Sequence, residues 1–392
     1  MLTFFRNRLF LAVTVGHFVI DVFNSVGPVL LAVLAAPLGL SNAQIGLALT
    51  LYTFAGALSQ PPFGLLADRF RGRPAALAGM GVAWTGLCFG LVALAPGWAV
   101  LLPCFLLAAF GSGLFHPIGT SSAAEAHRAR AGSATAVFFF CGQLGLALGP
   151  ALGGLLLRSG SHGLLPICLA ALLPAGLLLT APAAPPLPAG SASPARKPAR
   201  AIGLATLAFV ALVALRSSIQ AAYTAFLPKL FADRGWDPAA FGALSGTFML
   251  TAAIGNILTG ELADRQGMRV ATVWPLVLSV PAGLVCLWAP SPGAAFVACA
   301  LAGLLIGGQH SVLVVHAQRL LPARQGFAAG LILGFTFASG GLGTWLGGLV
   351  ADQVGLLVTM QAITLLGLPA ALLALTLPGR PVAAPAVRVA AR

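Results

Sequence analysis

Residues 64–73 read GLLADRFRGR, and residues 260–269 read GELADRQGMR, so the pattern Gly-x-Leu-Ala-Asp-Arg occurs twice, 196 residues apart. A second pattern, Gly149-x-x-x-Gly153-Gly154, recurs as Gly343-x-x-x-Gly347-Gly348 at an offset of 194. Phe115-His116 aligns with Gln309-His310 at the same offset. Three landmarks in one order at nearly one offset indicate that the chain contains two repeats.

The composition around these repeats is that of a membrane protein. Hydrophobic residues make up 59% of the 392 residues and charged residues only 7%, with a mean hydropathy of +0.97. A soluble domain carries about 25% charged residues, so a soluble enzyme, a disordered chain and a coiled coil are excluded. The apolar runs are continuous and do not alternate, which favours membrane-spanning helices over a β-barrel. The expected fold class is an all-α integral membrane protein.

A spanning helix needs about 20 apolar residues. Reading between Pro- and Gly-rich breaks predicts twelve such helices. They cover residues 9–35, 43–66, 75–95, 98–125, 133–157, 164–181, 202–230, 240–263, 271–289, 294–318, 327–350 and 355–377.

The basic residues indicate how these segments are oriented. Of the 21 Lys and Arg residues, 17 fall on one side of the twelve segments and three on the other, and Arg216 lies inside a segment. Basic residues are retained on the cytoplasmic side, so we expect a multi-pass protein of the plasma (inner) membrane with both termini in the cytoplasm. The net charge of +13 is then a topology signal, and no nucleic-acid partner is expected.

The stretch 181–201 holds six prolines and three basic residues, which is typical of an extended, solvated linker. It predicts three parts: an N-terminal six-helix bundle over 1–181, a cytoplasmic Pro-rich linker over 182–201, and a C-terminal six-helix bundle over 202–392.

The repeated motif resembles the loop signature GxxxDRxGRR of the major facilitator superfamily. Gly145-x-x-x-Gly149-Pro150-x-x-Gly153-Gly154 in the fifth segment matches the signature associated with proton-driven antiporters of that superfamily. The resemblance implies twelve helices in two pseudo-symmetric halves, alternating access, a cavity lined by helices one, four, seven and ten, and a monomer.

A narrower resemblance is to the fosmidomycin resistance protein group. It rests on four stretches: Gly16-His17-Phe18-x-x-Asp21, Ser59-Gln60-Pro61-x-Phe63-Gly64, Phe115-His116-Pro117, and Leu215-Arg216 followed by Phe226-Leu227-Pro228. The resemblance implies an efflux pump that exchanges protons for small molecules, including a phosphonate antibiotic.

Polar residues inside the membrane are candidates for substrate or proton binding, because a charge at the bilayer centre costs about 2.5–3.5 kcal/mol. Asp21 lies 12 residues into the first segment, about 18 Å deep. His17 lies four residues before it and Asn24 three after, so all three share one helical face. His17 is expected either to bind protons itself or only to bond Asp21.

Arg216 is the matching residue of the seventh segment, 195 residues after Asp21, with Gln220 and Tyr223 on the same face. A guanidinium suits a carboxylate, phosphate or phosphonate, so Arg216 is a candidate anion anchor. The alternative is a structural ion pair between Asp21 and Arg216. His116, Gln309 and His310 in segments four and ten are further candidates for substrate or proton contact, with ordinary packing as the alternative.

Two sets of residues are candidates for gating. The first closes segments two and eight at the cytoplasmic face, where carboxylates can bond a helix N-terminus or an arginine: Gly64, Asp68, Arg69, Gly260, Asp264 and Arg265. The second, in segment five, allows close helix contact and a bend: Gly145, Gly149 and Pro150.

The function expected from these features is secondary active transport by alternating access, as proton-coupled efflux (antiport) of a small anionic drug or metabolite. The alternative is a proton-linked importer of an organic anion. A membrane enzyme would need a catalytic motif such as HExxH or GxSxG, and the sequence has none. We therefore expect no catalytic residue, metal or cofactor; the expected partners are the substrate, protons and the lipid bilayer.

Overall fold

The computed structural model describes residues 4–69, 74–181, 203–289, 291–320 and 325–379, all helices and short connections within these ranges. The first group of helices is η1 (Phe4–Arg6), α1 (Arg8–Leu38), α2 (Asn42–Arg69), α3 (Pro74–Ala93), α4 (Trp98–Ala126), η2 (Arg128–Arg130), α5 (Ala131–Leu156), η3 (Leu157–Ser159), η4 (Ser161–Leu164), α6 (Leu165–Ala170) and α7 (Leu172–Leu179). The second is α8 (Leu204–Asp233), α9 (Pro238–Gln266), α10 (Met268–Trp288), α11 (Pro292–Gly307), α12 (His310–Leu320), α13 (Gln325–Val354), α14 (Leu356–Leu365) and α15 (Gly367–Ala374).

The predicted all-α membrane fold is confirmed. Eleven helical stretches of the described residues are long and apolar enough to cross a membrane. The twelfth, α2, is 28 residues long and runs beside α4 and α13. Three predicted segments are broken in the structure: 164–181 into η4, α6 and α7, 294–318 into α11 and α12, and 355–377 into α14 and α15.

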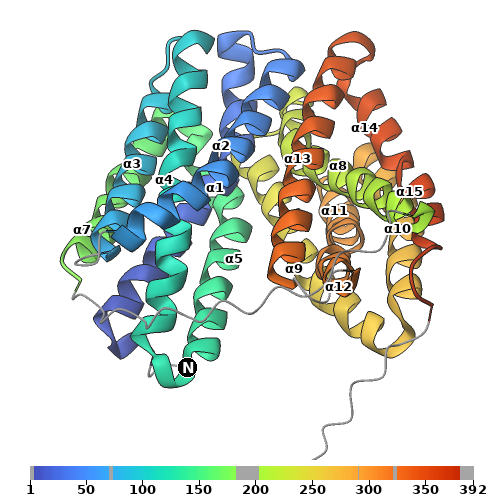
Figure 1. Ribbon diagram of the computed structural model, residues 1–392. Coiled ribbons are helices and arrows are strands. Elements are labelled where there is room, and N and C mark those ends of the chain that lie inside the picture. The colour runs from blue at the N-terminus through green and yellow to red at the C-terminus, as the bar shows by residue number, and fades with distance from the viewer. Residues whose placement is uncertain (1–3, 70–73, 182–202, 290, 321–324, 380–392) are drawn as a thin grey trace, which may run out of the picture.

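The helices form two groups side by side, which we call the N half (α1 to α7) and the C half (α8 to α15) (Figure 1). They meet along α2 against α13 and α5 against α9. We call the end at which α1 ends and α2 begins the far side, and the end at which α7 ends and α8 begins the linker side. The division at 182–201 stays a prediction, because those residues lie outside the described ranges.

Local sequence explains where the long helices begin and end. Asn7 precedes α1, and its side chain accepts a hydrogen bond from the Phe10 N–H, while Gly39 ends that helix with a φ of 59°, which favours glycine. Asp237 caps α9 in the same way and Pro238 follows at the first helical position. These signals place Asp21 and Arg216 in the middle of α1 and α8.

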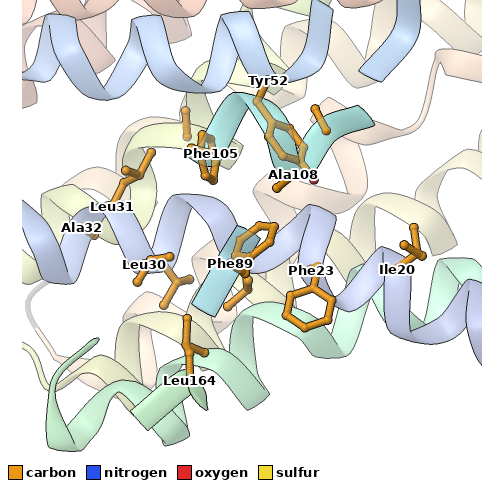
Figure 2. Packing of buried hydrophobic residues seen from close by; sticks show 14 of the residues in the cluster. Ile20, Phe23, Leu30, Leu31, Ala32, Tyr52, Phe89, Phe105, Ala108 and Leu164 are labelled. Carbon is orange, nitrogen blue, oxygen red and sulfur yellow. The ribbon is translucent and has the colours of Figure 1, made fainter. Parts of the chain in front are cut away.

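An aromatic cluster joins α2, α3 and α4 of the N half to α1 (Figure 2). The ring centroids of Tyr52 and Phe105 lie 4.7 Å apart, and those of Phe23 and Phe89 5.0 Å apart. All four side chains are buried. The outer surface, in contrast, exposes large apolar side chains such as Leu58, Leu173 and Leu204, as expected where lipid surrounds the helices.

Candidate functional site

Asp21 lies at the centre of a buried polar cluster in the N half. One carboxylate oxygen, Oδ2, is 3.2 Å from His17 Nε2, and the other, Oδ1, is 3.4 Å from His116 Nε2. Asn24 donates from Nδ2 to Oδ1 at 2.9 Å. His17 is 2% exposed and Asp21 5%, so water is largely excluded from the contact between them, whereas the His116 side chain is 22% exposed. The structure thus brings together four of the predicted residues, from α1 and α4.

The other ring nitrogens of the two histidines are fixed by backbone carbonyls. His17 Nδ1 is 2.9 Å from the Phe138 carbonyl oxygen, and His116 Nδ1 is 2.8 Å from that of Ser112. A carbonyl oxygen only accepts hydrogen bonds, so each Nδ1 carries a hydrogen. Both Nε2 atoms therefore face the Asp21 carboxylate with the lone pair of a neutral imidazole or the N–H of an imidazolium.

Two further side chains complete the cluster, and neither was among the predicted residues. Tyr52 of α2 donates from its hydroxyl to Asn24 Oδ1 at 2.7 Å, which leaves the Asn24 amide to face Asp21. Ser112 of α4 lies with its Oγ 3.1 Å from Asn24 Nδ2. Ser112 could have been found from the sequence, because it precedes His116 by one helical turn and so lies on the same helical face. Tyr52 could not, because its place in the cluster depends on the contact between α2 and α1.

The glycines of the α5 signature pack against α1 beside Asp21. A Cβ at Gly145 would collide with the Phe18 carbonyl, and one at Gly149 with Ser25 Oγ. Gly142, absent from the predicted set, is closest to the cluster: a Cβ there would lie 2.5 Å from His17 Nε2 and 2.7 Å from Asp21 Oδ2. Small residues in these positions let α5 approach α1 closely.

Pro150, the remaining predicted residue of this signature, lines a cavity of about 10 Å³ between the halves, with Ser25, Tyr223 and Phe248 among its neighbours. That volume is about that of one water molecule.

Arg216 is buried in the C half, and its side chain is 1% exposed. Nη2 donates to the carbonyl oxygens of Gly307 at 2.9 Å and Ile306 at 3.3 Å, and Nε lies 3.4 Å from Gln309 Oε1. Within the described residues no carboxylate pairs with this guanidinium. The predicted alternative of an ion pair between Asp21 and Arg216 is absent from this structure, because each group bonds inside its own half.

The remaining candidates of the seventh and tenth segments make no hydrogen bond to the Arg216 head group. Tyr223 is fully buried, and its hydroxyl is 2.7 Å from Thr364 Oγ1. Gln220 and His310 are half-buried, and no described residue bonds either side chain. His310 begins α12, one residue after Gln309.

The predicted gating residues of the linker side do not join the two halves where they are described. Arg265 pairs with Glu261 of its own helix, and Asp264 is exposed. Gly64 packs on Pro117, and Gly260 in the equivalent place on Ser311, each within its own half. The side chains of Asp68 and Arg69 lie outside the described residues.

The polar contacts between the halves lie toward the far side instead. Asp352, at the end of α13, accepts hydrogen bonds from the backbone N–H groups of Asn42 and Ala43 at 2.8 and 2.9 Å. Arg158 pairs with Asp237 at 3.1 Å, and Thr50 donates to the Gly341 carbonyl at 2.6 Å. Asp352 also accepts from Asn42 Nδ2 at 3.0 Å. In the described part of the chain the hydrogen bonds and ion pairs between the halves all lie toward this side, so this conformation is closed on the far side.

His17, Asp21 and His116 also form a group whose ligand atoms lie within 4.8 Å of one another, close enough to hold a metal ion. The hydrogen bonds among them account for their positions, and the carbonyl contacts of both Nδ1 atoms orient the rings. The chemistry that this cluster supports directly is the binding and release of protons.

Known proteins match this chain along most of its length. The family model of the Major Facilitator Superfamily matches residues 13–228 and again 207–391. The chain is 27% identical over 357 residues to the fosmidomycin resistance protein of Escherichia coli (strain K12), covering 88% of this chain and 86% of that protein. It is 29% identical over 375 residues to the uncharacterized MFS-type transporter YfnC of Bacillus subtilis (strain 168), covering 91% and 90%.

Among solved structures, a bacterial homolog of the human lysosomal transporter Spinster, in an inward-facing and occupied conformation, has the same fold. Its TM-score is 0.79 at 17% identity, covering 93% of this chain and 95% of that one. The sequence match and the fold agree with the two repeated six-helix halves. The chain belongs to the Major Facilitator Superfamily of membrane transporters.

Proposed function

We propose that this transporter is a proton-coupled antiporter that exports a small anionic molecule. The observation that supports it best is the Asp21 carboxylate held between the Nε2 atoms of His17 and His116. With a hydrogen on each Nδ1, each contact with the carboxylate forms a hydrogen bond only when a proton lies between the two atoms. The cluster can therefore hold none, one or two exchangeable protons.

The charge of this cluster changes with each proton. It is −1 without exchangeable protons, neutral with one and +1 with two. Net charge is costly inside the bilayer, so a conformation that exposes the cluster to water and one that buries it favour different proton counts. This difference couples proton binding to alternating access.

The groups that face Asp21 from the neighbouring helices make its proton count depend on conformation. They are His17 and Asn24 of α1, His116 of α4, and the Phe138 carbonyl with Gly142 and Gly145 of α5, backed by the Tyr52 hydroxyl of α2. Since α5 also packs on α9 of the C half, rocking of the halves changes the packing around the carboxylate. The contacts of Asp352 and Arg158 on the far side must open for this movement.

The proposed substrate class follows from Arg216. A guanidinium buried without a carboxylate partner suits an incoming oxyanion. The relative named for fosmidomycin resistance supports the same class, since fosmidomycin is a phosphonate. We propose export across the plasma membrane, with the linker side in the cytoplasm as the basic residues indicate.

Purified protein in liposomes tests this proposal. A ligand screen by thermal shift over fosmidomycin, phosphate, organic acids and cationic drugs first identifies a transported compound. An imposed pH gradient should then drive accumulation of an anion against its own gradient, and protons should move in the opposite direction to the anion. The Asp21→Asn variant should keep substrate exchange but lose the drive by the pH gradient.

Three results would contradict the proposal. Proton movement in the same direction as the substrate would make the protein an importer of the symport type. A thermal shift caused only by cations would contradict the assignment of Arg216 as the residue that binds an anion. Gradient-driven transport by Asp21→Asn at the wild-type rate would remove Asp21 from coupling.

A further inference from the structure

The tenth spanning segment is broken between α11 and α12, and one of the backbone hydrogen bonds missing there has both its acceptor and its donor bonded by side chains. In a continuous helix the Gly307 carbonyl would accept from the Ser311 N–H, four residues on. Here the Gly307 carbonyl accepts from Arg216 Nη2 at 2.9 Å, and the Ser311 N–H donates to Asn256 Oδ1 at 2.9 Å. Arg216 of α8 therefore binds the acceptor of the missing bond, and Asn256 of α9 binds its donor.

The neighbouring carbonyls at the end of α11 are bonded by side chains as well. The Ile306 carbonyl accepts from Arg216 at 3.3 Å, and the Leu305 carbonyl accepts from Gln309 Nε2 at 2.5 Å. The negative end of the α11 dipole therefore lies against a guanidinium, which is a favourable arrangement. Arg216 stabilises the broken form of this helix.

The break is specific to the C half. In the N half, α4 continues without interruption through Phe115 and His116, which are equivalent to Gln309 and His310. At the place of Ser311 stands Pro117, which has no N–H to donate. The C half therefore keeps a backbone N–H, that of Ser311, which could complete a continuous helix. In this structure Asn256 accepts the hydrogen bond from it.

An oxyanion competes directly for the atoms that hold the break open. Nη2 of the guanidinium is bonded to the α11 carbonyls, whereas no described residue bonds Nη1. An oxyanion that binds the guanidinium through two parallel hydrogen bonds needs Nη2, so it binds in this way only after those carbonyls are released. A guanidinium attracts an oxyanion by its opposite charge and can bind it through two parallel hydrogen bonds, which a single neutral carbonyl does not offer. The freed Gly307 carbonyl then has one ready partner, the Ser311 N–H.

We propose that the segment formed by α11 and α12 is a two-state element. Arg216 and Asn256 hold it broken, and an oxyanion bound to Arg216 converts it to a continuous helix. The inference rests on the proposed function, in which the substrate is an anion bound by Arg216. It adds Asn256 as a positioning residue, which never touches the anion but sets how tightly it binds.

The decisive variant is Asn256→Ala, with Thr247→Ala of the same helix as control because the Thr247 hydroxyl bonds only the Ala243 carbonyl of its own turn. Removing the Asn256 side chain destabilises the broken form, in which it bonds the Ser311 N–H, and leaves the stability of the continuous form unchanged. The anion identified in the thermal-shift screen should therefore bind Asn256→Ala more tightly, by about fivefold, the factor that corresponds to one ordinary hydrogen bond. Thr247→Ala should bind it as the wild type does.

Hydrogen–deuterium exchange on full-length protein in nanodiscs provides the second readout. The bound anion should slow exchange of the His310 amide by about tenfold, because this amide gains the Ile306 carbonyl as a helical partner, whereas the Ser311 amide is bonded in both forms. Asn256→Ala should show slowed exchange at His310 even without the anion.

The outcomes separate the two proposals. If no anion binds, or if Arg216→Gln binds it as tightly as the wild type, the anion assignment is wrong and the two-state element is wrong with it. If Arg216→Gln abolishes binding but Asn256→Ala binds no more tightly than the wild type, or if exchange at His310 is unchanged by the anion, only the two-state element is wrong.

Discussion

Asp21 and Arg216 occupy equivalent positions 195 residues apart, and each is bonded to the fourth helix of its own half. Asp21 reaches His116 of α4, and Arg216 reaches the end of α11. An acid and a base thus stand at matching places in two repeats, and in this conformation neither neutralises the other. In the function we propose, the N half binds protons and the C half binds an anion, and the packing between the halves links the two events.

The number of exchangeable protons should fall when one histidine is replaced. His116→Gln keeps a donor toward Asp21 but removes one of the two contacts in which a proton can lie. We expect two protons per transported anion in the wild type and one in the variant. The ratio is measured in liposomes from the membrane potential and pH gradient at which net flux stops. An unchanged ratio in a variant that still transports would contradict the assignment.

Gly142→Ala should abolish coupled transport. The added Cβ would lie 2.5 Å from His17 Nε2 and 2.7 Å from Asp21 Oδ2, closer than atoms in contact can approach, so α5 or the His17 ring must move. Gly176→Ala is the matched control, because a Cβ there meets no atom within 4 Å. Uptake assays should show loss of gradient-driven transport in the first variant and wild-type rates in the second.

Tyr52→Phe should lower stability and weaken coupling together. The Tyr52 hydroxyl donates the hydrogen bond that orients the Asn24 amide, and losing such a bond costs about 1 kcal/mol. A lower unfolding temperature in detergent and a smaller response to the pH gradient are expected. Thr53→Val, next to it on α2, removes a hydroxyl that bonds only its own helix and should leave the response to pH intact.

Asp352→Asn should favour opening of the far side. The variant removes the negative charge that accepts from the first N–H groups of α2. Spin labels at Ser41 and Val354 should report a longer and broader distance distribution than in the wild type. Asp233→Asn serves as control, since Asp233 pairs with Lys229 of its own helix on the same side. Equal distributions in the Asp352 variant and the wild type would contradict a role in closure.

The sequence was sufficient to predict the membrane helices, the repeat and the polar face of α1. Hydrophobicity and helical periodicity are properties of the chain itself, so His17, Asp21 and Asn24 could be placed on one face before any fold was known. Recurrence at a constant offset likewise placed Asp21 and Arg216 at equivalent positions.

Contacts that depend on a second helix were beyond such reasoning. Nothing around Tyr52 or Gly142 indicates that it reaches the Asp21 cluster, because both come from neighbouring helices. The break between α11 and α12 was missed for the same reason: its apolar sequence resembles an uninterrupted span, and the interruption depends on Arg216 and Asn256 of other helices. The far-side contacts of Asp352 were missed because a carboxylate at a helix end has no local signal of its partner.

The far-side contact of Asp352 also sets how this protein can diverge. The aspartate binds the main-chain amides of Asn42 and Ala43 and also the Asn42 side chain. The two main-chain bonds survive substitution of the Asn42 or Ala43 side chain while the acid is kept. Proline at position 43 is the exception, because it has no N–H to offer. Among descendants of this chain, the closure should thus tolerate many substitutions on one helix and few on the other.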